Sequence, residues 1–135
     1  MKRITIIGTG NIGLSLAKGL VKSEFCKAEQ ITLTRRNIKA LSHESQLGFV
    51  VTDNNVQAVQ DADIIVFAIL PQQLRKVLEE IAPVVKDSDQ IFVSVVSGVS
   101  CLDIKEVLGQ GTSVVRAMPN TAIAIGQSMT CIATD

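Results

Sequence analysis

The feature that most constrains the fold is a glycine-rich stretch near the start of the chain, between residues 2 and 21. An apolar run, Ile4–Ile7, leads into Gly8, Gly10 and Gly13, and the residues that follow have a helical pattern. Gly8 permits a tight turn, Gly10 has no Cβ to obstruct a phosphate, and Gly13 allows helix and strand to pack closely. The stretch therefore predicts a buried strand, a sharp turn and a helix whose first amides bind an anion.

Glycines spaced as glycine-x-glycine-x-x-glycine are common, so the surrounding pattern decides how they are interpreted. Here the motif directly follows a predicted strand and opens a predicted helix, which is the setting in which it holds a dinucleotide pyrophosphate. The alternative is a glycine turn that binds no ligand. We expect a pyrophosphate site formed by Gly8, Thr9, Gly10, Asn11, Ile12 and Gly13.

Short apolar runs alternate with helical patterns along the rest of the chain. We predict further strands at residues 30–34, 49–52, 63–70, 90–96, 113–117 and 128–134, and helices at residues 37–47, 56–60, 72–82 and 102–108. Helix caps are expected from Asn37, from one of residues 53–55, and from Ser100. The alternation predicts an α/β fold, a Rossmann-type, doubly wound, mostly parallel sheet with helices on both faces.

The composition argues against several classes of function. The 135 residues include 13 basic and 13 acidic side chains, no basic block, and no Trp or Tyr, so we expect no nucleic-acid partner. The apolar runs fall far short of the ~20 residues that a membrane helix needs, so we expect no membrane span. With 47% hydrophobic residues the chain can bury a core, and residues 1–135 are predicted to form one domain.

The cysteines and the single histidine predict no metal site. Cys26, Cys101 and Cys131 lack the paired spacing of metal ligands, and His43 lies in a polar run. We expect reduced cysteines in a cytoplasmic protein and a surface histidine. The first strand begins almost at once, which we interpret as the absence of a signal peptide.

The residues after the second predicted strand bear on the choice of dinucleotide. In NAD-preferring folds an acidic residue there accepts a hydrogen bond from the ribose 2′-hydroxyl, but this chain has Thr34, Arg35 and Arg36. A guanidinium can instead pair with a 2′-phosphate. NADP is therefore favoured over NAD, and the missing carboxylate also weakens FAD and S-adenosylmethionine as ligands. The alternative is that both arginines are simply solvated residues at a strand end.

Ligands of open parallel sheets bind beyond the carboxyl ends of the strands. The segments expected at that edge are residues 8–13, 34–36, 54–55, 68–71, 95–98 and 118–121. Several are rich in small or polar residues, as expected where a flat ring and a ribose lie against backbone. Each alone could be an ordinary loop, and together they define the candidate site.

Four segments together resemble one family. GTGNIG, NNVQAVQDADIIVFAILPQQ, SVVSGVS and VVRAMPNTAIAIGQSMT are similar to the nucleotide-binding domain of pyrroline-5-carboxylate reductases. The most specific match is Arg-x-Met-Pro-Asn-Thr, here Arg116 to Thr121, and the resemblance covers essentially the whole chain. It implies an NAD(P)H-dependent oxidoreductase of proline biosynthesis. The implied reaction is hydride transfer to the C=N bond of 1-pyrroline-5-carboxylate, giving L-proline, without a protein nucleophile or a metal.

The resemblance also implies roles for individual residues. The glycine loop would hold the pyrophosphate, Arg35 the 2′-phosphate, and Asn55 the adenosine ribose. The nicotinamide half would lie against Ala68, Ile69, Leu70, Pro71, Val95, Val96 and Ser97, and the residues nearest the substrate would be Pro119, Asn120 and Thr121.

In the family a helical C-terminal domain makes the dimer and supplies the groups that hold the substrate. Because this chain runs out in its last predicted strand, we expect a fragment of a longer two-domain enzyme that lacks this domain. No catalytic residue is then expected within residues 1–135. The chain alone is expected to bind the dinucleotide weakly or moderately and to be inactive, whereas the full-length enzyme would be a homo-oligomer.

Three positions depart from the family pattern. Leu70 replaces a lysine, Ala122 a proline and Ser128 a glycine. The loss of the lysine removes a positive charge near the cofactor, so a reductase of another imine or keto acid is an alternative. A non-catalytic nucleotide-sensing domain is a further alternative, but it would usually keep an acid after the second strand and has no reason to carry Met-Pro-Asn-Thr.

Overall fold

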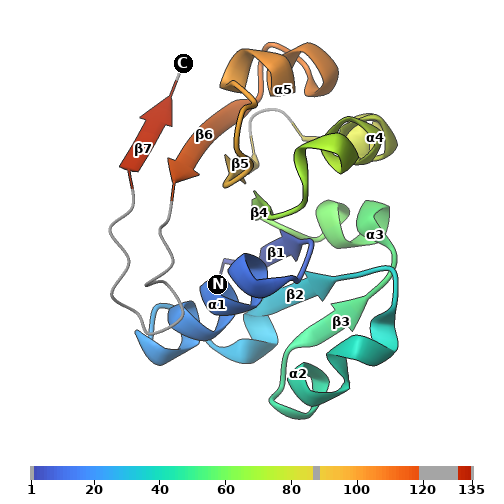
Figure 1. The fold of residues 1–135 in the computed structure, drawn as a ribbon, viewed down its shortest axis with the longest axis vertical. Coiled ribbons are helices and arrows are strands. Elements are labelled where there is room, and N and C mark those ends of the chain that lie inside the picture. The colour runs from blue at the N-terminus through green and yellow to red at the C-terminus, as the bar shows by residue number, and fades with distance from the viewer. Residues whose placement is uncertain (1, 87–88, 119–130, 135) are drawn as a thin grey trace.

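A computed structural model describes residues 2–86, 89–118 and 131–134 of the chain. Its strands form one seven-stranded sheet in the order β3-β2-β1-β4-β5-β6-β7, as Figure 1 shows. Neighbouring strands from β3 to β6 pair in parallel, and β7 pairs antiparallel with β6. The strands are β1 (Ile4–Ile7), β2 (Ile31–Thr34), β3 (Val50–Thr52), β4 (Ile64–Phe67), β5 (Ile91–Ser94), β6 (Ser113–Met118) and β7 (Cys131–Thr134). The predicted Rossmann-type, mostly parallel sheet is confirmed.

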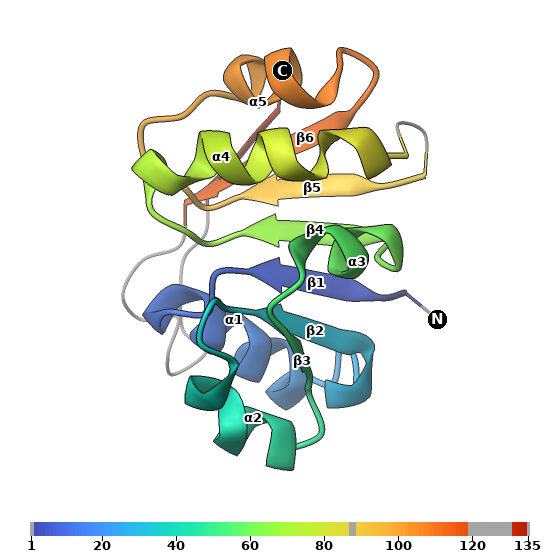
Figure 2. The same cartoon turned by 90° about the vertical axis from the view of Figure 1, so that its right-hand side faces the viewer.

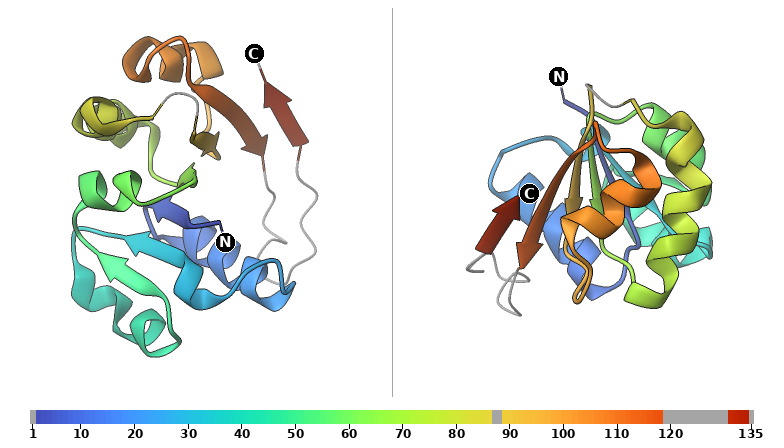
Figure 3. Two further views of the ribbon diagram at one scale, coloured as in Figure 1. Left: turned by 180° about the vertical axis from the view of Figure 1, so that it is seen from behind. Right: turned by 90° about the horizontal axis from the view of Figure 1, so that it is seen from above.

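Helices cover both faces of the sheet, also as predicted. The α3, α4 and α5 helices lie on one face, and α1 lies on the other (Figures 2 and 3). The α-helices are α1 (Asn11–Lys22), α2 (Ser42–Gln46), α3 (Asn55–Gln60), α4 (Pro71–Ile81) and α5 (Cys101–Leu108), and the 3-10 turns are η1 (Ala28–Gln30), η2 (Ile38–Leu41) and η3 (Ala82–Val84). Among the described residues, no helix is long and apolar enough to span a membrane.

The core consists of two apolar clusters, one on each face of the sheet. Successive residues of a strand point to opposite faces, so Val66 packs in the α1 cluster while Ile65 and Phe67 pack under α3, α4 and α5. The rings of Phe67 and Phe92 stack on neighbouring strands with centroids 5.9 Å apart. Burial on both faces explains why β4 is apolar at every position.

Several predicted boundaries of strands and helices were wrong. The strand predicted at residues 63–70 ends at Phe67, because Pro71 already occupies the first position of α4, where its missing N–H has no partner to lose. The strand predicted at residues 90–96 ends at Ser94. The helix predicted at residues 37–47 is two short pieces, η2 and α2. Residues 128–130 of the last predicted strand lie outside the described residues.

Of the predicted helix caps, two are made by side-chain hydrogen bonds and one is not. Asn37 is the N-cap residue of η2, as predicted, but within the described structure its side chain makes no cap hydrogen bond. Asn54 caps α3, since its Oδ1 accepts from the Gln57 amide at 3.1 Å. Ser100 caps α5 as predicted: its Oγ accepts from the Asp103 amide at 3.1 Å, and Asp103 accepts from the Ser100 amide in return.

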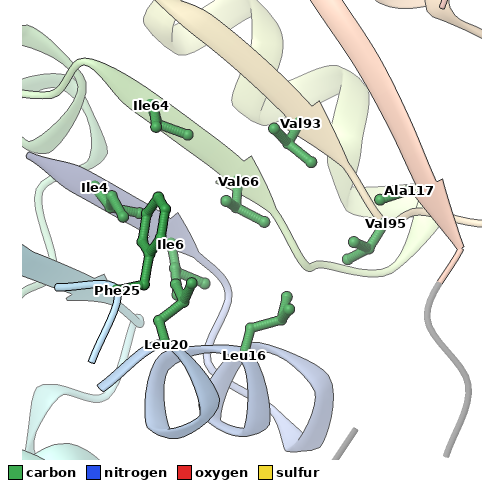
Figure 4. A pocket seen from close by; sticks show the side chains of 10 residues that line it. All are labelled: Ile4, Ile6, Leu16, Leu20, Phe25, Ile64, Val66, Val93, Val95 and Ala117. Atoms are coloured by element: carbon green, nitrogen blue, oxygen red, sulfur yellow. The ribbon is translucent and has the colours of Figure 1, made fainter. Parts of the chain in front are cut away.

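The α1 face of the sheet is only partly covered. An apolar groove remains on this side between α1 and strands β4, β5 and β6 (Figure 4). Phe25, which follows α1, is 66% exposed at this groove. Its other lining residues are Ile4, Ile6, Leu16, Leu20, Ile64, Val66, Val93, Val95 and Ala117.

Candidate dinucleotide site

The glycine loop joins the end of β1 to the start of α1. Gly8 has a φ of +88°, and a Cβ there would lie 2.7 Å from the Ala68 carbonyl oxygen. A Cβ on Gly13 would collide with the carbonyl oxygen of Gly8. A Cβ on Gly10, by contrast, would have no described atom within 4 Å apart from those of its two chain neighbours. The fold itself therefore requires Gly8 and Gly13, whereas the space above Gly10 is open for a ligand.

The amino end of α1 is suited to an anion. Gly10 is the N-cap, and the helix begins at Asn11 and runs for 12 residues. Its first turn contains no acidic side chain, and Lys22 lies in the last turn. The first amides and the positive end of the helix dipole are thus not neutralised by a carboxylate of the helix itself.

Thr9, between the first two glycines, connects the loop to the end of β2. Its Oγ1 donates to the carbonyl oxygen of Thr34 at 3.2 Å, and the Thr9 carbonyl accepts from Arg35 Nη1 at 3.4 Å. The Arg35 amide donates to the Thr52 carbonyl oxygen at 3.2 Å, which anchors this residue to β3. The Arg35 guanidinium therefore lies beside the glycine loop, and Arg36 follows it on the exposed surface.

The remaining predicted segments lie at the same edge of the sheet. Asn55 is the first residue of α3, which follows β3. The Ala68 amide donates to the Ile7 carbonyl oxygen at 2.8 Å, and the Val95 amide donates to the Phe67 carbonyl oxygen at 3.1 Å. Leu70 is the N-cap of α4 and is 58% exposed. The described site residues that the structure brings to this edge are Gly8, Thr9, Gly10, Asn11, Ile12, Gly13, Thr34, Arg35, Arg36, Asn55, Ala68, Ile69, Leu70, Pro71, Val95, Val96 and Ser97.

The other predicted site residues, Pro119, Asn120 and Thr121, lie outside the described residues. Ser94, a buried residue at the end of β5, was not among the predicted site residues. Its Oγ accepts from the Val96 amide at 3.2 Å, which shapes the turn that leads into the candidate site. The sequence signal that could have identified Ser94 is its hydroxyl at the carboxyl end of an otherwise apolar strand.

The described residues contain no cluster of metal-ligand type at this edge. Within residues 2–86, 89–118 and 131–134, no three His, Cys, Asp or Glu side chains gather as metal ligands would. His43 is exposed on α2, as predicted. Burial raises the pKa of the Cys26 thiol, which precedes β2 and so lies toward the opposite end of the sheet. The arrangement provides binding surfaces, namely amides, a guanidinium and apolar walls.

Residues 3–98 match the family model described as NADP oxidoreductase, coenzyme F420-dependent. Pyrroline-5-carboxylate reductase 2 of Dictyostelium discoideum is 42% identical over 135 residues, which cover 98% of this chain and 45% of that protein. The pyrroline-5-carboxylate reductase of Pseudomonas aeruginosa is 34% identical over 126 residues, with 93% of this chain and 45% of that protein covered.

Solved structures agree with this relationship. A pyrroline-5-carboxylate reductase from Coxiella burnetii superimposes with a TM-score of 0.93 and 29% identity, covering 99% of this chain and 50% of that one. The Plasmodium falciparum pyrroline carboxylate reductase, solved with NADP bound, has a TM-score of 0.83 at 23% identity, covers 99% of this chain and 48% of that one, and supports the fold alone.

The chain spans about half the length of these relatives. The resemblance to pyrroline-5-carboxylate reductases that the motifs indicated is confirmed over nearly every residue. The chain is a nicotinamide-dinucleotide-binding domain of Rossmann type, and it belongs to the family described as NADP oxidoreductase, coenzyme F420-dependent.

Proposed function

We propose that this chain is the cofactor-binding domain of an enzyme that reduces 1-pyrroline-5-carboxylate to L-proline with NADPH, in proline biosynthesis. One observation carries the proposal. It is the 42% identity to a pyrroline-5-carboxylate reductase across 98% of the chain.

NADP is proposed as the preferred cofactor. The Arg35 guanidinium lies beside the loop proposed to hold the pyrophosphate, where a 2′-phosphate would meet it. No carboxylate follows β2 to accept a hydrogen bond from an unmodified ribose.

The remaining residues are proposed to bind and orient the dinucleotide. Residues 8–13 would hold the pyrophosphate and Asn55 the adenosine ribose, while residues 68–71 and 95–97 would line the nicotinamide half. When bound, the reduced nicotinamide supplies a hydride to the imine carbon of the substrate. This chain would contribute position and charge, with residues 119–121 closest to the substrate and no nucleophile of its own.

Residues 1–135 are proposed to form one domain of a two-domain, homo-oligomeric, cytoplasmic enzyme. The length of the relatives supports this, since the chain covers 45% of the Dictyostelium protein. Substrate-binding groups are proposed to come from the second domain.

The test is made with the full-length enzyme that carries this domain. NADPH consumption is followed with 1-pyrroline-5-carboxylate, and proline is identified as the product. Binding of NADPH without consumption would disprove the substrate assignment. Because Leu70 is exposed at the site in place of the family lysine, other cyclic imines and keto acids are assayed beside it, and faster turnover of one of these would favour the second candidate.

A further inference from the structure

We infer that Thr9 is a positioning residue that sets selectivity for NADP over NAD, because it joins the glycine loop to the strand end that carries Arg35. The inference rests on the proposed function, in which the loop holds the pyrophosphate and Arg35 the 2′-phosphate. It concerns a residue that the glycine motif leaves unspecified, since any side chain can stand between the first two glycines.

The Thr9 side chain is buried, and its hydroxyl donates one hydrogen bond. The residue is 1% exposed, and its Oγ1 donates to the Thr34 carbonyl oxygen at 3.2 Å. Strands β1 and β2 are parallel neighbours with Ile7 opposite Thr34, so the loop after β1 lies directly beside the end of β2. The hydrogen bond thus fixes the glycine loop to the residue that immediately precedes Arg35.

A second hydrogen bond runs in the opposite direction. Arg35 Nη1 donates to the Thr9 carbonyl oxygen at 3.4 Å, while the Arg35 backbone is held through its amide by Thr52. At 3.4 Å this bond is long and therefore weak, so the guanidinium is held near the loop yet can transfer to phosphate oxygens, which are stronger acceptors. Holding the long side chain close to its bound position lowers the entropy lost when the cofactor binds.

Thr9 therefore couples two parts of the site that recognise different groups of the cofactor. The pyrophosphate is common to NADPH and NADH, whereas the 2′-phosphate belongs to NADPH alone. If the Thr9 hydroxyl only stabilised the loop, its loss would weaken both dinucleotides equally. If it positions Arg35, its loss weakens NADPH more, and the ratio of the two dissociation constants changes.

The test compares Thr9→Val, which keeps the shape but loses the hydroxyl, with Thr9→Ser, which keeps the hydroxyl. We expect Thr9→Val to reduce the preference for NADPH over NADH about three- to tenfold, the loss of one buried hydrogen bond, and Thr9→Ser to retain it. Thermal unfolding of each variant establishes that it is folded. Thr9→Ala replaces the valine variant should that one fail to fold.

Arg35→Ala, alone and combined with Thr9→Val, separates this inference from the proposed function. We expect the double variant to show no further loss of selectivity beyond Arg35→Ala. A change in selectivity with Arg35→Ala but none with Thr9→Val, or additive losses, would overturn the role of Thr9 alone. Equal affinity of the wild-type protein for both dinucleotides, unchanged by Arg35→Ala, would overturn the proposed cofactor preference and this inference with it.

Discussion

The carbonyl oxygen of Gly8 occupies the space that a Cβ on Gly13 would need. This contact brings the first turn of α1 against the end of β1 and so fixes where the helix begins. Gly10 lies between Gly8 and Gly13 in the loop and takes no part in this contact. Two of the three glycines are therefore explained by packing alone, whereas packing does not explain Gly10.

This difference predicts opposite behaviour for two alanine substitutions. Gly13→Ala is expected to destabilise the fold by about 1–3 kcal/mol, because the new methyl group meets backbone that cannot move aside. Gly10→Ala is expected to leave the unfolding free energy within about 1 kcal/mol, yet to weaken dinucleotide binding about tenfold or more. Urea unfolding and NADPH titration of both variants check this. Tight binding by Gly10→Ala would show that no phosphate approaches that residue.

Removing the cap of α3 is expected to lower stability by about 1 kcal/mol. In Asn54→Ala the Gln57 amide loses the side-chain acceptor that lies at 3.1 Å. Asn37→Ala is the matched control, since within the described structure Asn37 makes no cap hydrogen bond and its loss should change stability by less than about 0.5 kcal/mol. Chemical denaturation measures both. Equal effects of the two substitutions would contradict the assignment of the caps.

Two phenylalanines should differ widely in their contribution to stability. Phe67→Ala removes a fully buried ring that stacks on Phe92, and it is expected to lower the unfolding free energy by about 3–5 kcal/mol. Phe25→Ala removes a ring that is 66% exposed at the groove, and the expected change is below about 1 kcal/mol. Thermal and urea unfolding compare them. A large loss for Phe25→Ala would mean that the groove is closed in solution.

The parts of the fold that sequence predicted well are those fixed by local chemistry. The β1 strand, the loop and α1 follow from where glycines are required, and β4 follows from a short apolar run that is typical of a strand covered on both faces. Ser100 was predicted as a cap, and so was one of residues 53–55, because a short polar side chain precedes each helical pattern; the structure shows that the second cap is Asn54.

What sequence could not predict depends on contacts between distant residues. Asn37 has the same local signature as Asn54, but the chain after it forms η2 and makes no use of the cap. Ile12 continues the apolar spacing of α1, yet it is 44% exposed, while the small residues Gly13 and Ala17 face the sheet. The hydrogen bond from Thr9 to Thr34 joins residues 25 positions apart, and no periodic pattern in the sequence indicates it.

The proposed NADP site is tested most directly by titrating the protein with NADPH and with NADH, in the wild type and in Arg35→Ala. Arg3→Ala, which removes a guanidinium just before β1 at the opposite end of the sheet, is the control of equal charge. We expect the wild type and Arg3→Ala to bind NADPH more tightly than NADH. Arg35→Ala should weaken NADPH binding about tenfold or more and abolish that difference, because charge-assisted hydrogen bonds to the 2′-phosphate are lost. Equal binding of both dinucleotides by all three proteins, or no binding by any, would contradict the proposed NADP site.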